Sequence, residues 1–340
     1  MSTVLVIGGT GAMGTPVVRR LLAEPRTTVS VLTRDPSSDR ATALRTASRG
    51  RVELVQGDLA DPASVENAMK GVDGVFCNTD FFATMSPARE YEQGLNALQA
   101  AEKAGVARFV WSSLDYAGVL TDGRIPVPHY DAKAAVAAHI ALRQSEEAMR
   151  KNSDGWYSTS VAVLVTAPYF ENFQFRMAPE RGRLPDGREG LTFAVPLGAG
   201  RYPLIGLDDI AFFASLMLED WQQWRGRTLR VVADSLTGEQ IAATFERVTG
   251  IPSIYRPVPL DDVRAAMPDI GHDLAAMFEF FQDYNVFDRA RDVAYLRRLH
   301  PQLMSFENWV RASGWDGTVH EVQARPVQVG GRDDPARHEG

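Results

Sequence analysis

The feature that most constrains the fold is a glycine-rich loop between an apolar stretch and an amphipathic one, close to the start of the chain. Residues 4–7 read Val-Leu-Val-Ile, which is typical of a buried strand, and residues 15–23 have the apolar spacing of a helix. The segment 8–14 between them reads GGTGAMG. Glycines let the backbone turn sharply here and let a pyrophosphate reach the free N–H groups of the helix N-terminus. The loop therefore predicts a dinucleotide site, with a plain tight turn as the alternative, and its predicted contacts are Gly8, Thr10, Gly11, Ala12, Met13 and Gly14.

The same alternation of strand and helix repeats along the first half of the chain. Short apolar runs stand at 29–32, 52–55, 75–77 and 109–111, each followed by an amphipathic stretch, and a β-branched run follows at 160–165. Such alternation requires a parallel sheet that helices cover on both faces. We therefore predict an α/β fold, a doubly wound parallel Rossmann sheet of about six strands.

The pattern changes after residue 166. Segment 167–206 is rich in Pro, Gly and aromatic residues, which indicates irregular backbone and a hairpin instead of another strand-helix-strand unit. Further helices are predicted at 207–218, 237–249 and through most of 260–313, with short strands at 227–232 and 253–258. We predict a dinucleotide-binding domain at 1–166 to which later segments return, a smaller dependent α+β substrate lid at 167–323, and a disordered tail at 324–340.

Composition excludes several classes of protein. Hydrophobic residues at 45% and charged residues at 23% are globular averages. The single cysteine, Cys77, cannot form an internal disulfide, and we expect it to be structural and in a reducing compartment. A net charge of −7 without a dense basic run disfavours direct nucleic-acid binding, and no window approaches the apolar length of a membrane span. With no signal peptide at its start, the chain is expected to be cytoplasmic, as a monomer or homodimer.

The end of the second strand indicates which dinucleotide the loop would bind. Residues 32–35 read Leu-Thr-Arg-Asp. NAD sites usually place an acidic residue here for the ribose diol, whereas NADP sites place a cation for the 2′-phosphate. The planar guanidinium of Arg34 can bind a phosphate through two hydrogen bonds. We predict NADP(H) as the cofactor; the alternative is a solvated Arg34, with Asp35 bound to the ribose of NAD.

Polar residues also follow the third and fourth strands. Asp58 and Leu59 would lie beside the adenine, and Asn78 and Thr79 would line the ribose and nicotinamide side. The alternative is that these residues only cap helices or form turns.

Eight motifs follow one another along the chain: GGTGAMG at 8–14, LTRDP at 32–36, GDLAD at 57–61, FVWSS at 109–113, HYDAK at 129–133, APYFENF at 167–173, VPLGAGRYPLIGLDDIA at 195–211 and SFENWV at 305–310. In their order and spacing they resemble the NmrA-like family of atypical short-chain dehydrogenases, over about residues 3–316. The resemblance implies a Rossmann domain that binds NADP(H), with a smaller C-terminal part that closes over the nicotinamide. Some members resemble isoflavone, phenylcoumaran or quinone reductases, and others look like redox sensors that bind a protein partner.

The resemblance also implies catalytic residues. Short-chain dehydrogenases usually carry a Tyr four positions before a Lys, but here His129 stands four positions before Lys133, and Tyr130 is one position off. Lys133 is expected to bind the nicotinamide ribose. His129 is expected either to donate a proton or only to bond the loop before it. Ser113 is predicted near the substrate carbonyl, with a purely structural hydroxyl as the alternative.

The family pattern places Pro168 and Tyr169 against the nicotinamide. Aromatic side chains in segments near the carboxyl edge of the sheet would form an apolar substrate pocket, although ordinary core packing is the alternative for each one. Asp208 and Asp209 lack His or Cys companions at ligand spacing, so we expect no metal site. The predicted pocket residues are Phe81, Phe82, Tyr169, Phe173 and Phe193, with Phe170 and Tyr202 in the same segments.

These residues lead to two hypotheses. The first is an NADPH-dependent reductase of a small aromatic carbonyl, enone or quinone-like substrate, with Lys133 on the ribose and His129 as proton donor. The second is a non-catalytic NADP(H) sensor that acts through a regulatory protein partner, which the missing Tyr favours.

Overall fold

Seven parallel strands form the central sheet of the computed structural model, which describes residues 2–151, 154–284 and 291–319. The strand order is β10-β6-β5-β4-β1-β2-β3, which is the doubly wound Rossmann order with one strand added at an edge. That added strand comes from the segment predicted at 227–232. The strands are β1 (Ser2–Ile7), β2 (Thr27–Thr33), β3 (Val52–Gln56), β4 (Gly74–Cys77), β5 (Arg108–Ser113), β6 (Val161–Val165) and β10 (Thr228–Arg230).

Alternate residues of the central strands enter two different cores, as expected for a sheet covered on both faces. Leu5 and Ile7 of β1 pack with helices α3 (Pro62–Ala68), α5 (Pro87–Ala104) and α7 (Pro128–Met149). Val4 and Val6 pack with α1 (Gly14–Ala23), α2 (Asp39–Ala47) and α9 (Leu207–Glu219). Since α9 lies beyond residue 166, the chain returns to cover the sheet after it has left it.

Cys77 is fully buried in β4, and burial raises the pKa of its thiol. A neutral, inaccessible thiol fits the structural role expected of it.

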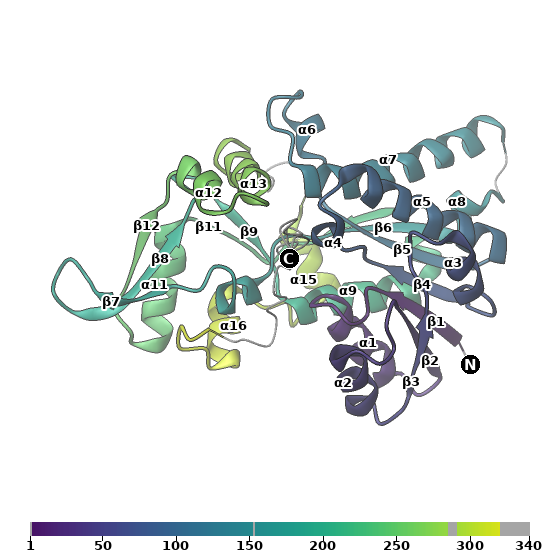
Figure 1. Cartoon of the computed structure of the whole chain (residues 1–340), viewed down its shortest axis with the longest axis horizontal. Helices are drawn as coiled ribbons and strands as arrows, with labels where there is room; N and C mark the ends of the chain where they lie inside the picture. The colour runs from purple at the N-terminus through teal and green to yellow at the C-terminus, as the bar shows by residue number, and fades with distance from the viewer. Residues whose placement is uncertain (1, 152–153, 285–290, 320–340) are drawn as a thin grey trace, which may run out of the picture.

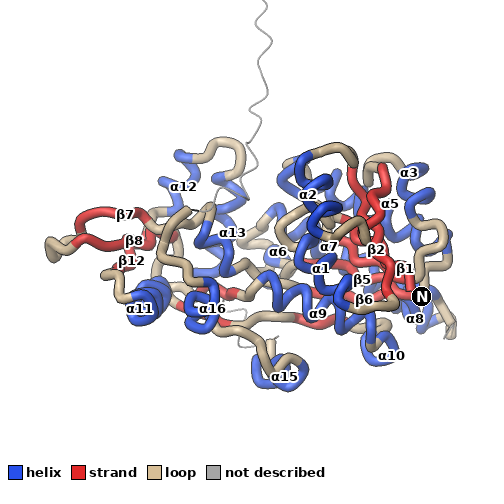
Figure 2. The backbone as a smooth tube through the Cα atoms, turned by 90° about the horizontal axis from the view of Figure 1, so that it is seen from below, coloured by secondary structure: helices blue, strands red, loops and turns tan. Residues whose placement is uncertain are grey.

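Most elements after residue 166 gather at one end of the molecule, beyond the carboxyl edge of the sheet, whereas α9 lies against the sheet (Figures 1 and 2). The predicted hairpin is present, since β7 pairs antiparallel with β8 and β12 joins β8 in parallel. A second small sheet pairs β9 with β11. These strands are β7 (Glu180–Arg183), β8 (Glu189–Val195), β9 (Tyr202–Leu204), β11 (Asp234–Leu236) and β12 (Ser253–Pro257).

The helices of this part are α11 (Gly238–Thr249), α12 (Leu260–Ala266), α13 (Gly271–Asp283), α15 (Val293–Leu299) and α16 (Phe306–Ser313). Thr237 caps α11 as predicted, in a reciprocal capping box with Gln240. The short elements are α4 (Phe81–Thr84), α6 (Ala117–Leu120), α8 (Trp156–Ser160), α10 (Trp221–Trp224) and the 3-10 helix η1 (Phe170–Gln174).

One hydrophobic core runs from the sheet into the C-terminal part. Val6 and Leu164 of the sheet belong to the same buried cluster as Phe193, Phe245 and Trp315. The C-terminal part therefore depends on the sheet for its packing, as the lack of a separate alternating pattern predicts.

A buried arginine ties the C-terminal segment to the sheet. Arg291 pairs with Asp115 after β5 at 2.9 Å, and it donates hydrogen bonds to the carbonyls of Thr166 after β6 and Val231 after β10. Its side chain is fully buried. One guanidinium thus joins the carboxyl ends of three strands.

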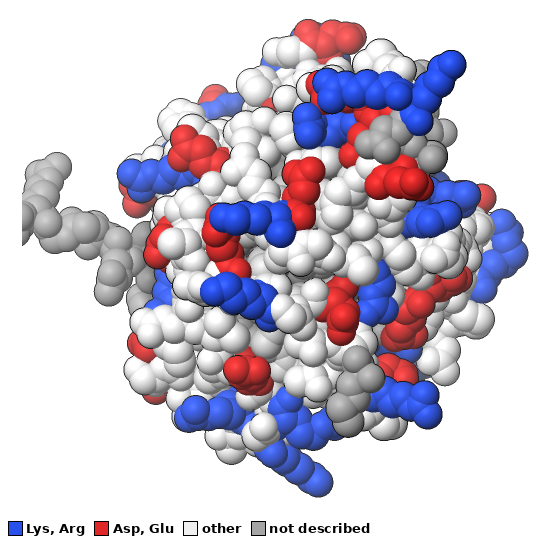
Figure 3. Space-filling model, turned by 90° about the vertical axis from the view of Figure 1, so that its right-hand side faces the viewer, with Lys and Arg blue, Asp and Glu red and all other residues white. Residues whose placement is uncertain are grey.

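Acidic and basic side chains are interspersed on the face shown in Figure 3. Within residues 2–151, 154–284 and 291–319, no helix has the length and apolarity needed to span a bilayer. The tail predicted at 324–340 lies outside the described residues, as does the end of the predicted lid at 320–323.

Candidate functional site

The glycine-rich loop is folded tightly between β1, β4 and α1. Gly8 has a φ of 80°, and a Cβ there would lie 2.3 Å from the carbonyl oxygen of Asn78. A Cβ on Gly14 would lie 2.1 Å from the carbonyl oxygen of Gly8. The loop therefore needs glycine at both positions to bring the start of α1 against the end of β4.

The N-terminus of α1 is suited to bind an anion. No side chain in the described part of the chain caps this helix, and its first turn holds no acidic residue. The first amides of a helix have no partner within the helix and carry a partial positive charge. Ala12 is exposed at this point, and Thr10 and Gly11 are partly exposed. The loop thus fits the pyrophosphate of a dinucleotide.

Arg34 and Asp35 follow β2 with different surroundings. Asp35 Oδ1 accepts hydrogen bonds from the Ser37 amide at 2.8 Å and the Ser37 hydroxyl at 2.6 Å, which lower the pKa of the Asp35 carboxyl. Arg34 is exposed, and it forms no ion pair with any described residue. The cation is accessible to a phosphate, whereas the carboxylate is engaged in a local turn.

The residues after β3 make local contacts. Asp58 Oδ1 accepts a hydrogen bond from the amide of Ala60 at 2.9 Å, and the Leu59 carbonyl accepts one from Asn96. Both Asp58 and Leu59 are partly exposed at the edge of the sheet. Their predicted contact with the adenine stays a prediction.

Lys133 lies at the centre of a buried polar network. Its ammonium donates to the Thr79 carbonyl at 2.7 Å and to the Thr79 hydroxyl at 2.8 Å, and it pairs with Glu90 at 2.8 Å. The Thr79 hydroxyl in turn donates to Glu90 at 2.6 Å. Asn78 Oδ1 is more distant, at 3.5 Å. An ammonium has three donors, so in this structure the protein itself engages the group predicted to bind a ribose.

Glu90 was missed by the sequence analysis, although a signal was present. It lies in α5 on the face that also carries the buried residues Gly94, Ala97 and Ala101. A carboxylate on the apolar face of a helix needs a buried cation as its partner. The side chain of Glu90 is fully buried, and its Oε2 has no hydrogen-bond partner among the described residues.

His129 lies one helical turn before Lys133 and meets a residue from the C-terminal part. Its Nδ1 lies 2.6 Å from Oδ2 of Asp273 in α13, and its backbone amide donates to Oδ1 of Asp273 at 3.1 Å. The rings of Phe81 and Phe82 lie 6.0 and 5.3 Å from the imidazole, between centroids. Asp273 was not predicted, because nothing local links it to a residue so far along the chain.

The neighbouring Tyr130 cannot replace the missing tyrosine acid. It is buried, and burial raises the pKa of its hydroxyl well above the ordinary value of 10.0. Of these two neighbours, His129 is thus the candidate proton donor.

Ser113, predicted near the substrate carbonyl, lies inside the fold at the end of β5. It is fully buried, and its hydroxyl donates to the carbonyls of Leu114 at 3.2 Å and Lys133 at 3.3 Å. The hydroxyl satisfies main-chain acceptors, as the structural alternative expects, and its contact with a substrate stays a prediction. Ser112 is similarly buried, with its hydroxyl 3.3 Å from the sulfur of Met13.

The predicted aromatic pocket divides into two groups. Phe82 is 37% exposed beside His129, and Phe81 packs edge-on against it. Phe173 and Phe193 are fully buried in the aromatic core of the C-terminal part, 5.9 Å apart between ring centroids. Both rings are thus placed as the alternative of core packing expects, and their contact with a substrate stays a prediction.

Pro168 and Tyr169 stand after β6, where both are partly exposed. The Pro168 carbonyl accepts a hydrogen bond from Ile205, which aligns this segment with β9. Glu171 follows, and its carboxylate accepts hydrogen bonds from the Leu207 amide at the start of α9 and from the Trp309 indole. Contact of Pro168 and Tyr169 with a nicotinamide stays a prediction.

Arg176 joins the two parts of the molecule near His129. Its guanidinium carbon lies 5.3 Å from the ring centroid of Phe82 and 5.8 Å from that of Phe175. Phe82 is thus covered on one side by a cation from the C-terminal part.

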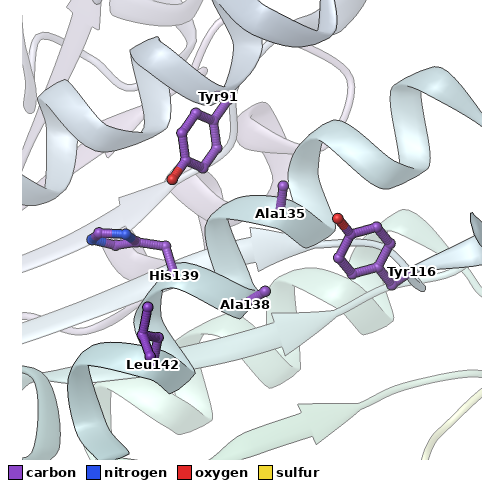
Figure 4. A pocket seen from close by; sticks show the side chains of 6 residues that line it. All are labelled: Tyr91, Tyr116, Ala135, Ala138, His139 and Leu142. Carbon is purple, nitrogen blue, oxygen red and sulfur yellow. The ribbon is translucent and has the colours of Figure 1, made fainter. Parts of the chain in front are cut away.

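A separate surface pocket lies between α5 and α7, as Figure 4 shows. None of the predicted cofactor residues lines it. Within the described part of the chain, no group of three or more His, Cys, Asp or Glu side chains could hold a metal ion. The lining residues of this pocket are Tyr91, Tyr116, Ala135, Ala138, His139 and Leu142.

Comparison with known proteins identifies similar chains. The model of the NmrA-like family matches residues 1–310. An NmrA-like family domain-containing oxidoreductase of Aspergillus flavus, lnaB, is 28% identical over 262 residues, which is 75% of each chain. An NAD(P)H azoreductase of Xenophilus azovorans is 27% identical over 268 residues, covering 79% of this chain and 81% of that protein.

Two of the solved structures with the same fold were determined with a nicotinamide cofactor bound. The negative transcriptional regulator NmrA in complex with NADP aligns with a TM-score of 0.70 at 18% identity, over 93% of this chain and 98% of that one. The NADPH-dependent quinone oxidoreductase QOR2 of Escherichia coli, complexed with NADPH, aligns with a TM-score of 0.67 at 21% identity, over 92% and 100%. At these identities the similarity shows the fold.

Removal of Glu90 is expected to leave the buried Lys133 ammonium without a counter-charge. Glu90→Leu should lower the free energy of unfolding in urea by about 3–5 kcal/mol, and Glu90→Leu with Lys133→Met should recover most of that loss. Glu66→Leu, which breaks the exposed Lys103–Glu66 pair, should cost at most about 1 kcal/mol. If Glu90→Leu lowered the free energy of unfolding as little as Glu66→Leu does, the stabilising role of the buried Lys133–Glu90 pair would be contradicted.

Burial of Glu171 is expected to make stability depend on pH. Burial raises the pKa of its carboxyl from 4.5 to about 7, so the folded protein holds the proton more tightly than the unfolded chain does. The stabilisation is fully present below about pH 4.5 and is lost as the pH rises through about 7. We expect a fall of up to about 3 kcal/mol in the free energy of unfolding from this group.

Glu171→Gln should flatten this fall between about pH 5 and 8, since the amide stays neutral. The exposed Glu239→Gln is the matched control and should leave the curve unchanged. Identical pH curves for wild type and Glu171→Gln would disprove the assignment.

Proposed function

Since the chain belongs to the NmrA-like family, we propose that it is an NADPH-dependent reductase of small aromatic acceptors such as quinones, aromatic carbonyls or enones. The observation that carries the proposal is the place of His129, a protonatable group beside the partly exposed ring of Phe82. It lies on the same sheet edge as the loop suited to a dinucleotide. A flat apolar acceptor fits the Phe82 ring, and a reduction needs a proton donor at that point.

The relatives support a reductase. The similar chains of Aspergillus flavus and Xenophilus azovorans are named as an oxidoreductase and an NAD(P)H azoreductase. The quinone oxidoreductase of the same fold was crystallised with NADPH, and NmrA with NADP. The substrate of this chain is not inferred from any one of them.

In this proposal, the start of α1 and Arg34 bind the cofactor, and His129 and Phe82 contact the acceptor. The amides at the start of α1 bind the pyrophosphate, and the exposed Arg34 binds the 2′-phosphate, which selects NADP(H). When bound there, NADPH supplies a hydride. Lys133 holds Thr79 and Asn78 in place at the end of β4, where they form the wall on the ribose side. His129 donates a proton to the acceptor oxygen, and Phe82 packs against the acceptor ring.

A second candidate is a non-catalytic NADP(H)-binding regulator that acts through a protein partner. Its specific support is that the Lys133 ammonium is engaged by Thr79 and Glu90 and that Tyr130 is buried. A sensor must discriminate between cofactor forms, so calorimetry with NAD⁺, NADH, NADP⁺ and NADPH tests it. Equal affinity for all four would exclude the regulator.

Turnover distinguishes the two candidates. With NADPH and a panel of quinones, azo dyes, enones and aromatic aldehydes, we expect loss of the reduced nicotinamide absorbance with at least one acceptor. His129→Gln should slow this reaction by roughly 100-fold, because the proton donor is gone. The absence of turnover with every acceptor would exclude the reductase.

Arg34 is expected to select the phosphorylated cofactor. Arg34→Ala should weaken NADPH binding by roughly 10-fold or more, as measured by calorimetry, and leave NADH binding unchanged. Arg45→Ala removes the same charge from an exposed position on α2 and serves as the control. Equal NADPH affinity in Arg34→Ala and Arg45→Ala would favour the NAD alternative instead.

A further inference from the structure

The contact between Asp273 and His129 fixes the histidine at two points. Asp273 stands in the first turn of α13, with Oδ2 at 2.6 Å from the imidazole Nδ1 and Oδ1 accepting the backbone amide of His129 at 3.1 Å. The two side chains are only 9% and 8% exposed. The 2.6 Å contact does not have the geometry of a hydrogen bond, and neither Nδ1 nor Oδ2 forms a hydrogen bond with any described residue. The carboxylate thus meets His129 through both of its oxygens.

A carboxylate on Nδ1 determines the chemistry of the other ring nitrogen. It favours the tautomer with the proton on Nδ1. Nε2 is then the nitrogen that exchanges a proton with a bound molecule. Since the ring lies beside Phe82, which is 37% exposed, this exchange takes place at the proposed acceptor site.

A second buried pair in the same protein has different surroundings. His300 Nε2 lies 2.8 Å from Asp209 Oδ1, but the His300 ring is stacked flat on Phe212, with centroids 3.8 Å apart and an interplanar angle of 9°. Phe213 packs edge-on against the same ring. The Asp209–His300 pair therefore belongs to the packing of α9. Because it is also a buried contact between a carboxylate and an imidazole, it serves as the control for the Asp273–His129 contact.

We propose that Asp273 is the positioning residue of the reductase, which orients His129 so that Nε2 protonates the reduced acceptor. This inference rests on the proposed function. The hydride from NADPH adds to the acceptor and carries two electrons, so NADPH is oxidised to NADP⁺. The Nε2–H bond of the imidazolium breaks as the O–H bond of the product forms. The neutral imidazole then regains a proton from water, and Asp273 stays ionised throughout.

The proposal also links the C-terminal part to the chemistry. Lys133 and His129 both lie on α7, whereas Asp273 is supplied by α13. The proton donor is therefore oriented only when α13 is docked against the start of α7.

The first measurement needs neither NADPH nor turnover. Nitrogen-15 NMR of histidine-labelled protein, with the His129 signal assigned by its loss in His129→Gln, should show the Nδ1-protonated tautomer of the neutral ring in the wild type. Asp273→Asn should lose this preference, and Asp209→Asn should keep it. An unchanged His129 tautomer in Asp273→Asn would overturn the proposal.

The second measurement separates positioning from stability. Asp273→Asn should lower kcat by roughly 10- to 1,000-fold and leave the KM for NADPH within about twofold. Asp209→Asn should keep kcat within about twofold even if it lowers the melting temperature. A kcat for Asp273→Asn no lower than that for Asp209→Asn would overturn the proposal.

A double variant keeps the test independent of folding. If Asp273 acts through His129, Asp273→Asn combined with His129→Gln should be no slower than His129→Gln alone. A further loss in the double variant would show that Asp273 acts elsewhere. If no acceptor is reduced, the proposed function fails, and the tautomer measurement alone still decides whether Asp273 orients His129.

Discussion

The buried ion pair between Lys133 and Glu90 is the interaction on which the geometry of the site depends. It joins α7 to α5 and, through Thr79, to the end of β4. A buried charge tolerates little displacement, since loss of its partner leaves it without compensation. The pair therefore fixes α7 against the carboxyl edge of the sheet, and His129 is carried on the same helix one turn away.

Some residues of the site are positioned by the local backbone, and others by contacts across the fold. The glycine-rich loop and Arg34 belong to consecutive strand-helix units and are positioned by local backbone. His129 instead receives its orienting carboxylate from α13, and Phe82 is covered by Arg176. The loop and Arg34 are thus positioned by the strand-helix units of the sheet, whereas the surroundings of the proposed acceptor site depend on contacts between the two parts.

The sequence predicts what short-range patterns determine. The alternation of strands and helices, the tight glycine loop and the Thr237 cap each follow from neighbours within a few residues. The partners Glu90 and Asp273 could not be predicted in the same way, because their roles arise from pairing across the fold. The number of aromatic residues in a segment likewise does not show whether they line a pocket or fill a core. Phe82 is at the surface, whereas Phe193 is fully buried.

The ion pair between Arg291 and Asp115 limits when the edge of the sheet can fold during synthesis on the ribosome. Asp115 and Arg291 are 176 residues apart, so their ion pair cannot form until Arg291 has been synthesised. Contacts so distant in sequence form late, because the chain between them must first be closed into a loop. Until then the Asp115 carboxylate lacks this cation. The sheet edge therefore takes its final form only after Arg291 has been synthesised and has docked against the ends of β5, β6 and β10.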